Sequence, residues 1–193
     1  ASPIAALMTS LGAFINLLTT LYPLPMGILV STVVGMVLTL PISSAAICIS
    51  LGIDGLAAGA AVVGCSCQMI GFAVSSYKEN KLGGLISQGL GTSMLQIPNI
   101  WNNPLIWLPP TLTAAILGPV STMVFKMENN SAGAGMGTSG LVGQFNAVAV
   151  MGFDALPQIV LMHFILPAVI TLLISTWIRK KGWIKDGDML LQK

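Results

Sequence analysis

The hydrophobic pattern of this chain is dominated by long stretches that contain no charged residue. A helix that crosses a bilayer needs roughly 20 predominantly apolar residues, and each stretch is long enough for one. Segments such as AAILGPVSTMVF and FILPAVITLLISTWI are continuously apolar, whereas the strands of a membrane β-barrel alternate apolar and polar residues. The pattern therefore predicts an all-α, polytopic transmembrane helical bundle. The charge-free stretches are residues 1–53, 55–77, 82–125, 129–153 and 155–178.

Turn-forming residues divide these stretches into separate elements. The pattern predicts a shorter helix of about 11 residues after Pro41, too short to cross a bilayer. A break is expected near Pro109 and Pro110, because proline removes a backbone hydrogen bond inside a helix. Gly27, Ser31 and Gly35 form a small-residue stripe that favours close contact between helices. The long helices are predicted at residues 4–21, 26–40, 56–77, 104–125 and 155–178.

Two polar segments interrupt this pattern and share the phrase G-x-G-T-S. The first contains GLGTSML at residues 89–95, and the second contains GMGTSGL at residues 135–141. Irregular backbone at membrane depth is tolerated only where protein buries it or where it lines a wet cavity, and transporters place pairs of such segments at their binding sites. The phrases therefore favour broken, re-entrant segments. Tight helix packing, which also uses Gly, Ser and Thr, is the alternative.

The phrases also supply candidate binding groups. Glycine permits a positive φ and a close approach of the backbone to a ligand, and Ser and Thr hydroxyls both donate and accept hydrogen bonds. A phosphate-binding loop is not favoured, because no G-K-[ST] follows either phrase. The candidate residues are Gly91, Thr92, Ser93, Gly137, Thr138 and Ser139.

Ionisable residues inside a membrane are functional candidates by default. Glu128 is the strongest, because Asn129 and Asn130 beside it carry amides suited to a polyol. An exposed loop position is the alternative for Glu128. His163, inside the last helix, is a second candidate or else a packing residue. We interpret the two remaining acids, Asp54 and Asp154, as helix caps.

The placement of Lys and Arg predicts the orientation. Short cytoplasmic loops are enriched in these residues, so the loop at residues 78–81 and the C-terminus after Arg179 are both expected in the cytoplasm. The helices at 104–125 and 155–178 supply the two crossings between these points. The two glycine phrases would then enter from opposite faces. Lys126, placed outside by this scheme, is an objection to it.

Composition restricts the class of protein further. The chain is 54% hydrophobic and 7% charged, whereas a soluble domain is typically about 25% charged. Its net charge of +2 gives no reason to expect a nucleic-acid partner. No metal site, cofactor or stand-alone catalytic site is expected, because no metal-ligand cluster or nucleophile–base pair is present. We interpret the cysteines as packing residues; they are Cys48, Cys65 and Cys67.

Several long phrases resemble the perfringolysin O regulator family, which is classed with the phosphotransferase-system enzyme IIC membrane components. They are LTLPISSAAI, GLAAGAAVVGCSCQMIGFAV, QGLGTSMLQIPNI, NPLIWLPPTL and MENNSAGAGMGTSGLVGQ. The resemblance covers essentially the whole chain and implies one membrane-embedded IIC-like domain, residues 1–193. Family members are longer at the N-terminus, so we expect an N-terminal portion to be missing.

The resemblance implies a sugar permease of the bacterial plasma membrane. Such proteins present a sugar to a cytoplasmic IIB protein, which works with IIA, and they commonly form homodimers. A Glu beside a re-entrant loop and a His contribute to their sugar site; Glu128 matches this setting, and His163 matches it loosely. A membrane sensor or regulator without transport, and a channel, are the alternatives.

Overall fold

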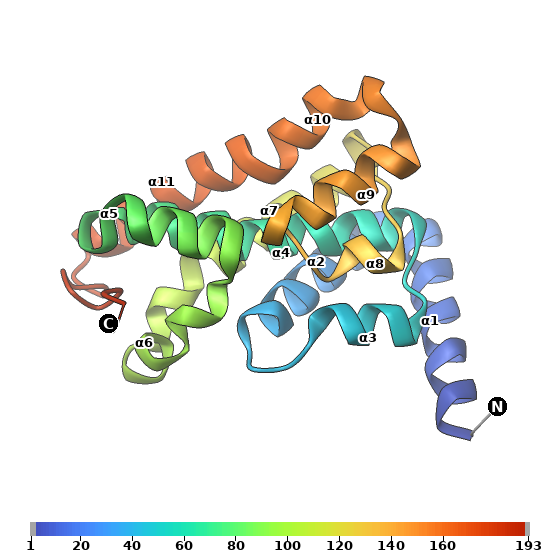
Figure 1. Ribbon diagram of the computed structural model, residues 1–193, viewed down its shortest axis with the longest axis horizontal. Helices are drawn as coiled ribbons and strands as arrows, with labels where there is room; N and C mark the ends of the chain where they lie inside the picture. The colour runs from blue at the N-terminus through green and yellow to red at the C-terminus, as the bar shows by residue number, and fades with distance from the viewer. Residues whose placement is uncertain (1–2, 192–193) are drawn as a thin grey trace.

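The computed structural model describes residues 3–191, which form a helical bundle (Figure 1). The α-helices are α1 Pro3–Leu21, α2 Pro23–Thr39, α3 Ser44–Leu51, α4 Gly55–Ser75, α5 Tyr77–Ile86, α6 Ile97–Asn102, α7 Leu108–Pro119, α8 Ser131–Ala134, α9 Val142–Met151, α10 Leu156–Val160 and α11 Leu166–Lys180. Three π-helical segments are η1 Ser87–Gly91, η4 Val120–Val124 and η7 Leu161–Ile165. Four 3-10 turns are η2 Ser93–Gln96, η3 Pro104–Trp107, η5 Ser139–Leu141 and η6 Phe153–Ala155.

Within the described residues, four helical segments are long and apolar enough to cross a membrane, which confirms the predicted helical membrane bundle. The expected break at Pro109 and Pro110 is wrong. Both prolines lie in the first turn of α7, where a missing N–H leaves no helical hydrogen bond unmade. The four segments are Pro3–Leu21, Gly55–Ser75, Pro104–Val124 and Phe153–Lys180.

Helix α4 is the centre of the bundle and is buried on all sides over most of its length. Its small residues permit very close contacts with its neighbours. A Cβ atom added at Gly64 would lie 1.9 Å from the Ser31 carbonyl oxygen of α2. On the other side of α2, Gly27 faces Gly118 of α7, and the Ser31 hydroxyl donates to the Ala114 carbonyl oxygen at 2.7 Å. The predicted small-residue stripe of α2 is therefore a helix contact.

Charged residues separate to the two ends of α4. The basic end, where α4 and α11 finish, carries Lys78, Lys81, Arg179, Lys180, Lys181 and Lys185, together with Glu79, Asp186 and Asp188. The acidic end, where α4 begins, carries Asp54, Glu128, Asp154 and Lys126. Figure 1 shows the tail that follows α11 beside α5 and α6, at the basic end, where Asn80 and Asn99 bond its backbone.

The predicted capping roles of the two acids at the acidic end are not seen. Asp54 occupies the N-cap position of α4, but its side chain makes no capping hydrogen bond. Asp154 is exposed in the 3-10 turn η6 and caps nothing. The short helix predicted after Pro41 is α3, which the Ser43 hydroxyl caps by accepting from the Ala46 N–H at 3.2 Å.

Helix α1 is steeply inclined to α4 in Figure 1 and is mostly exposed. It packs closely against the bundle at Gly12. A Cβ atom added there would lie 1.5 Å from the Leu51 carbonyl oxygen at the end of α3. The Asn16 side chain forms hydrogen bonds with the segment that connects α3 to α4. It donates to the Gly52 carbonyl oxygen at 2.9 Å and accepts from the Asp54 N–H at 3.1 Å.

Candidate functional site

The first glycine phrase lies at the turn of a helical hairpin, residues 77–102. Helix α5 and η1 run back along α4 from the basic end, and η2 and α6 return toward that end (Figure 1). In η1 the Gln88 amide donates to the hydroxyl of Ser76, the residue that follows α4, at 2.9 Å. Further along, Gly89 packs against Ala73 of α4. The first hairpin therefore extends only partway along α4 and returns to the basic end, from which it started.

The second phrase lies at the turn of a second hairpin, residues 127–151, which starts from the acidic end. The Asn129 N–H donates to the Gly55 carbonyl oxygen at 3.2 Å, at the first residue of α4. The chain then advances along α4, so that Gly137 lies against Cys65 near the middle of that helix. Helix α9 carries it back, and the Glu128 N–H lies 3.3 Å from the Met151 sulfur.

The two hairpins meet through Thr138. Its fully buried hydroxyl donates to the Gly89 carbonyl oxygen at 2.5 Å and lies 3.6 Å from the sulfur of Met69 in α4. The neighbouring Ser139 is half-buried, and its hydroxyl makes no hydrogen bond within the described chain. The sequence predicts two broken segments that approach each other from opposite ends, and the described backbone has this form.

The two central glycines of the phrases have different environments. Gly137 has a φ of +55°, and a Cβ there would lie 2.8 Å from the carbonyl carbon of Cys65. Gly91 has no positive φ and is exposed, and a Cβ there would meet nothing within 4 Å. Close packing against the protein therefore requires glycine at position 137, whereas the role of Gly91 in approaching a ligand stays a prediction.

The remaining polar residues of the first phrase differ: Thr92 makes a local cap, and Ser93 joins a buried network. Thr92 caps η2 by accepting from the Met94 N–H at 3.1 Å. The Ser93 hydroxyl is 2.9 Å from the Thr39 hydroxyl, which in turn lies 3.4 Å from the Gln68 side-chain oxygen. Sequence reasoning missed Gln68, although a lone glutamine in the apolar run of α4 was the signal that marked it.

Gln68 ties this network to α7 and is itself fully buried. Its oxygen accepts from the Trp107 ring N–H at 3.0 Å, and its nitrogen donates to the Thr111 hydroxyl at 3.1 Å. A buried network in which each member has a partner holds one arrangement of its elements. The first hairpin is thus bonded to α2, α4 and the start of α7.

Asn129 and Asn130 hold the second hairpin together. The Asn129 side chain is fully buried; it donates to the Gly143 carbonyl oxygen at 3.0 Å and accepts from the Asn130 N–H at 2.9 Å. Asn130 caps α8 by accepting from the Gly133 N–H at 3.0 Å, and it donates to Asn146 at 2.9 Å. Both amides therefore already have protein partners.

Glu128 is adjacent to these residues in the chain but takes no part in their side-chain hydrogen bonds. It is exposed at the base of the second hairpin, and its carboxylate has no hydrogen bond or ion pair within the described residues. The structure therefore brings Thr138 to the meeting point of the hairpins and leaves Glu128 at the acidic end.

His163 has a different environment, fully buried in the π-helical segment η7. Single π-helical turns inside helices occur frequently at functional sites. Its Nδ1 atom lies 3.0 Å from the side-chain nitrogen of Gln144, the second residue after Val142 at the start of α9. Since that amide nitrogen only donates, Nδ1 accepts, and a neutral ring carries its proton on Nε2.

This pair leaves one donor and one acceptor unused. The Nε2 atom of His163 and the Oε1 atom of Gln144 are buried and have no partner. Unsatisfied groups of this kind are few in native structures, and each calls for an explanation. Gln144 was missed by the sequence reasoning, although it ends the phrase MENNSAGAGMGTSGLVGQ.

The cysteines contribute to packing. All three are buried and unpaired with one another, and the Cys65 sulfur lies 3.7 Å from the carbonyl oxygens of Val34 and Ala134. Among residues 3–191 no group of three or more His, Cys, Asp or Glu side chains is arranged to hold a metal ion.

The sequence matches the family model described as Phosphotransferase system, EIIC, over residues 1–191. The chain belongs to this EIIC family. The comparisons with curated proteins and with solved structures give no match. The EIIC family and the four apolar helical segments make the chain an integral membrane component of a sugar phosphotransferase system.

The bond between the hairpins of this EIIC chain is testable with an isosteric change. Thr138→Val removes the hydroxyl but keeps the shape, and it leaves the buried Gly89 carbonyl oxygen without its donor. An unsatisfied buried acceptor costs about 1–3 kcal/mol. We expect the free energy of unfolding to fall by about that amount, measured by thermal unfolding in detergent. Thr20→Val, at an exposed position whose hydroxyl bonds only within α1, is the matched control; equal stability of Thr138→Val and the parent would contradict the bond.

Proposed function

We propose that this EIIC chain binds a sugar or a similar small polar solute between its two hairpins and translocates it. The observation that carries the proposal is the hydrogen bond from Thr138 to Gly89, which joins two hairpins that start from opposite ends of α4. Broken segments that point at each other inside a bundle are typical of transporter binding sites near the midplane. The six phrase residues named from the sequence are proposed to line the route.

The unpaired groups of Gln144 and His163 suggest how such a solute is held. A sugar hydroxyl both donates and accepts, so it would satisfy the acceptor Oε1 of Gln144 and the donor Nε2 of His163 together. Glu128, which has a free carboxylate at the acidic end, is proposed to bind the solute when it arrives at or leaves that end. Asn129 and Asn130 are proposed to contribute indirectly, because their hydrogen bonds hold the second hairpin in the shape that forms the site.

The finer features of the family resemblance are also proposals. They comprise transfer of phosphate to the solute by cytoplasmic IIB and IIA partners, a homodimer, and residence in the bacterial plasma membrane. The narrower resemblance to the perfringolysin O regulator family adds a regulatory role as a second hypothesis. That role needs a bound solute but no uptake.

The decisive experiment starts with a ligand. The purified protein is heated with a panel of sugars, sugar phosphates and nucleosides, because a selective ligand raises the unfolding midpoint by mass action. The active compound is then followed as radiolabelled uptake into cells that express the chain. A stabilising sugar with uptake supports the proposal, a stabilising sugar without uptake supports the sensor, and no stabilisation by any sugar overturns the proposal.

The site assignment is tested with matched glutamines. Gln144 is buried near the second phrase, whereas Gln158 is exposed on α10. We expect Gln144→Leu to weaken binding of the active sugar about three- to tenfold, the effect of one lost hydrogen bond, and Gln158→Leu to leave it unchanged. Equal affinities of the two variants, measured by titration calorimetry, would remove Gln144 from the site.

The contribution of Glu128 is tested in the same assay. Loss of a charged hydrogen bond costs about 1.5–3 kcal/mol, so Glu128→Gln is expected to lower affinity by roughly tenfold or more. Expression and oligomeric state should not change, because the carboxylate is exposed. An affinity within about twofold of the parent would make Glu128 an ordinary loop residue.

The orientation is a further proposal, with the basic end in the cytoplasm. We expect cysteines at Lys81 and Lys185, both exposed at that end, to be labelled only from inside, and a cysteine at the exposed Asp154 only from outside. Membrane-impermeant maleimide on intact cells provides the measurement, with the three buried native cysteines as an unlabelled background. External labelling at position 81 would reverse the assignment.

A further inference from the structure

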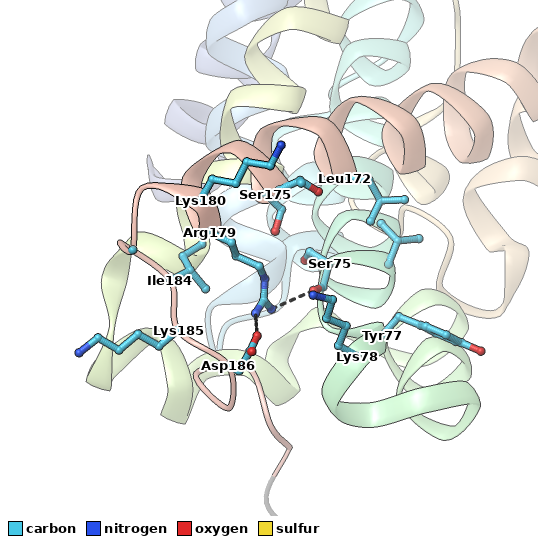
Figure 2. Close-up of a pocket in the computed structure, with 13 residues that line it drawn as sticks. Ser75, Tyr77, Lys78, Leu172, Ser175, Arg179, Lys180, Ile184, Lys185 and Asp186 are labelled. Carbon is cyan, nitrogen blue, oxygen red and sulfur yellow. Dashed lines mark hydrogen bonds and ion pairs between the residues drawn. The ribbon is translucent and has the colours of Figure 1, made fainter.

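A hollow of about 670 Å³ lies at the basic end, between the end of α4, the end of α11 and the C-terminal tail. Figure 2 shows Arg179 near its centre, bonded to the Ser75 carbonyl oxygen at 3.1 Å and to Asp186 at 3.1 Å. Arg179 also pairs with Glu79 at 2.8 Å. Its charge is therefore balanced within the protein.

The lysines that line the hollow, unlike Arg179, have no acidic partner among residues 3–191. Lys78, Lys180 and Lys185 line it and take part in no ion pair within the described chain. In Figure 2 the amines of Lys180 and Lys185 both extend away from Arg179, that of Lys180 over α11 and that of Lys185 toward the opposite side. Of the described residues, Lys78 of α5 and Lys180 of α11 are the free cations on the helical walls of the hollow. An unpaired positive surface around a hollow favours an anionic occupant.

A buried hydroxyl in the wall also lacks a partner. Ser175 of α11 is 2% exposed, lines the hollow, and has an Oγ atom without a hydrogen-bond partner. Figure 2 shows it on the α11 wall, above Ser75. A hydroxyl in this position can donate to a phosphate oxygen.

Two apolar grooves begin at the hollow. The outer groove follows the exposed face of α11, has Leu173 and Trp177 in its wall, and shares Leu172 and Lys180 with the hollow. The inner groove shares Val74 with the hollow and passes Phe164 to reach Gly89. Both grooves therefore lead from a cationic hollow along helices assigned to the membrane.

We propose that the hollow binds the phosphate headgroup of an anionic phospholipid, with one acyl chain in each groove. Basic pockets between transmembrane helices on the cytoplasmic side bind anionic headgroups, and Trp177, Trp183 and Tyr77 at this end are the residue types that occupy the membrane interface. A soluble phosphate would use the hollow but not the grooves. The headgroup position lies at the basic end and does not depend on the proposed solute site; only the far end of the inner groove approaches the first hairpin, at Gly89.

The test uses the purified full chain in detergent, titrated with phosphatidylglycerol or phosphatidylcholine and observed by native mass spectrometry. We expect phosphatidylglycerol to bind more tightly. Lys78→Gln and Lys180→Gln should each lower its affinity about fivefold, whereas Lys126→Gln, at the acidic end, should not change it. Lys78, Lys180 and Lys126 are all exposed, so folding should be unaffected, and unfolding midpoints without lipid verify this.

Three outcomes would overturn the proposal. Equal affinity for the two lipids would remove the headgroup selectivity. An unchanged affinity in both Lys78→Gln and Lys180→Gln would place the lipid elsewhere. Displacement of phosphatidylglycerol by an equal concentration of glycerol phosphate would show that the hollow is a site for soluble phosphate esters.

Discussion

Gly137→Leu is expected to detach the second hairpin from α4 and to abolish solute binding, whereas Gly91→Leu is expected to leave the fold intact. Gly137 has a φ of +55°, and a Cβ there would lie 2.8 Å from both the carbonyl carbon and the Cβ of Cys65. The backbone of α4 has no room to yield, because that helix is buried on all sides. Together, the strained φ and the overlap should cost about 3 kcal/mol or more.

The native cysteine provides the measurement. Cys65 is buried under the second hairpin and contacts the Ala134 carbonyl oxygen at 3.7 Å. We expect N-ethylmaleimide to modify Cys65 at least tenfold faster in Gly137→Leu than in the parent, since about 1.4 kcal/mol of lost protection already gives that factor. Gly91→Leu, where a side chain meets open space, should behave as the parent does.

Two results would contradict this account. Unchanged labelling of Cys65 in Gly137→Leu would show that the hairpin turn accommodates a side chain. Fast labelling in Gly91→Leu would show that the first phrase is as tightly packed as the second. A Gly91→Leu variant that keeps Cys65 protected but loses solute binding would place Gly91 on the solute route, as the sequence predicts.

Glu79→Gln is expected to destabilise the basic end strongly, and Asp186→Asn only slightly. Arg179 pairs with both acids, at 2.8 Å and 3.1 Å, but the Glu79 side chain is 6% exposed and that of Asp186 is 85% exposed. Removing one partner of a buried pair costs about 3 kcal/mol or more. An exposed pair contributes at most about 1 kcal/mol and is screened by salt.

The comparison is made by thermal unfolding in detergent at low and high ionic strength. We expect a clear fall in the unfolding midpoint for Glu79→Gln at both salt concentrations, because its pair is shielded from solvent. Asp186→Asn should lower the midpoint slightly, and only at low salt. Similar small effects for both variants would mean that the tail, rather than the buried pair, holds α4 and α11 together at this end.

The sequence by itself determined the class and the main elements of this protein. In lipid every backbone hydrogen bond must close within its own helix, so each spanning segment appears as a local run of apolar residues. For the same reason GLGTSML and GMGTSGL stand out, because glycine and hydroxyl residues are unusual where an unbroken helix would do. The helical bundle is confirmed in the described residues, and both phrases lie at the turns of hairpins.

The tertiary structure alone decided which of the polar residues have partners and which are free. Asn129 and Asn130 are used inside the second hairpin, Gln144 meets His163, and Glu128 is left exposed. Several of the decisive contacts join residues far apart in the chain, such as Thr138 with Gly89. Identical letters in the two phrases therefore have different environments, because Gly137 packs against a buried helix while Gly91 faces open space. The local sequence pattern indicates whether a segment can satisfy its own backbone hydrogen bonds. The packing of the segments determines what each side chain contacts.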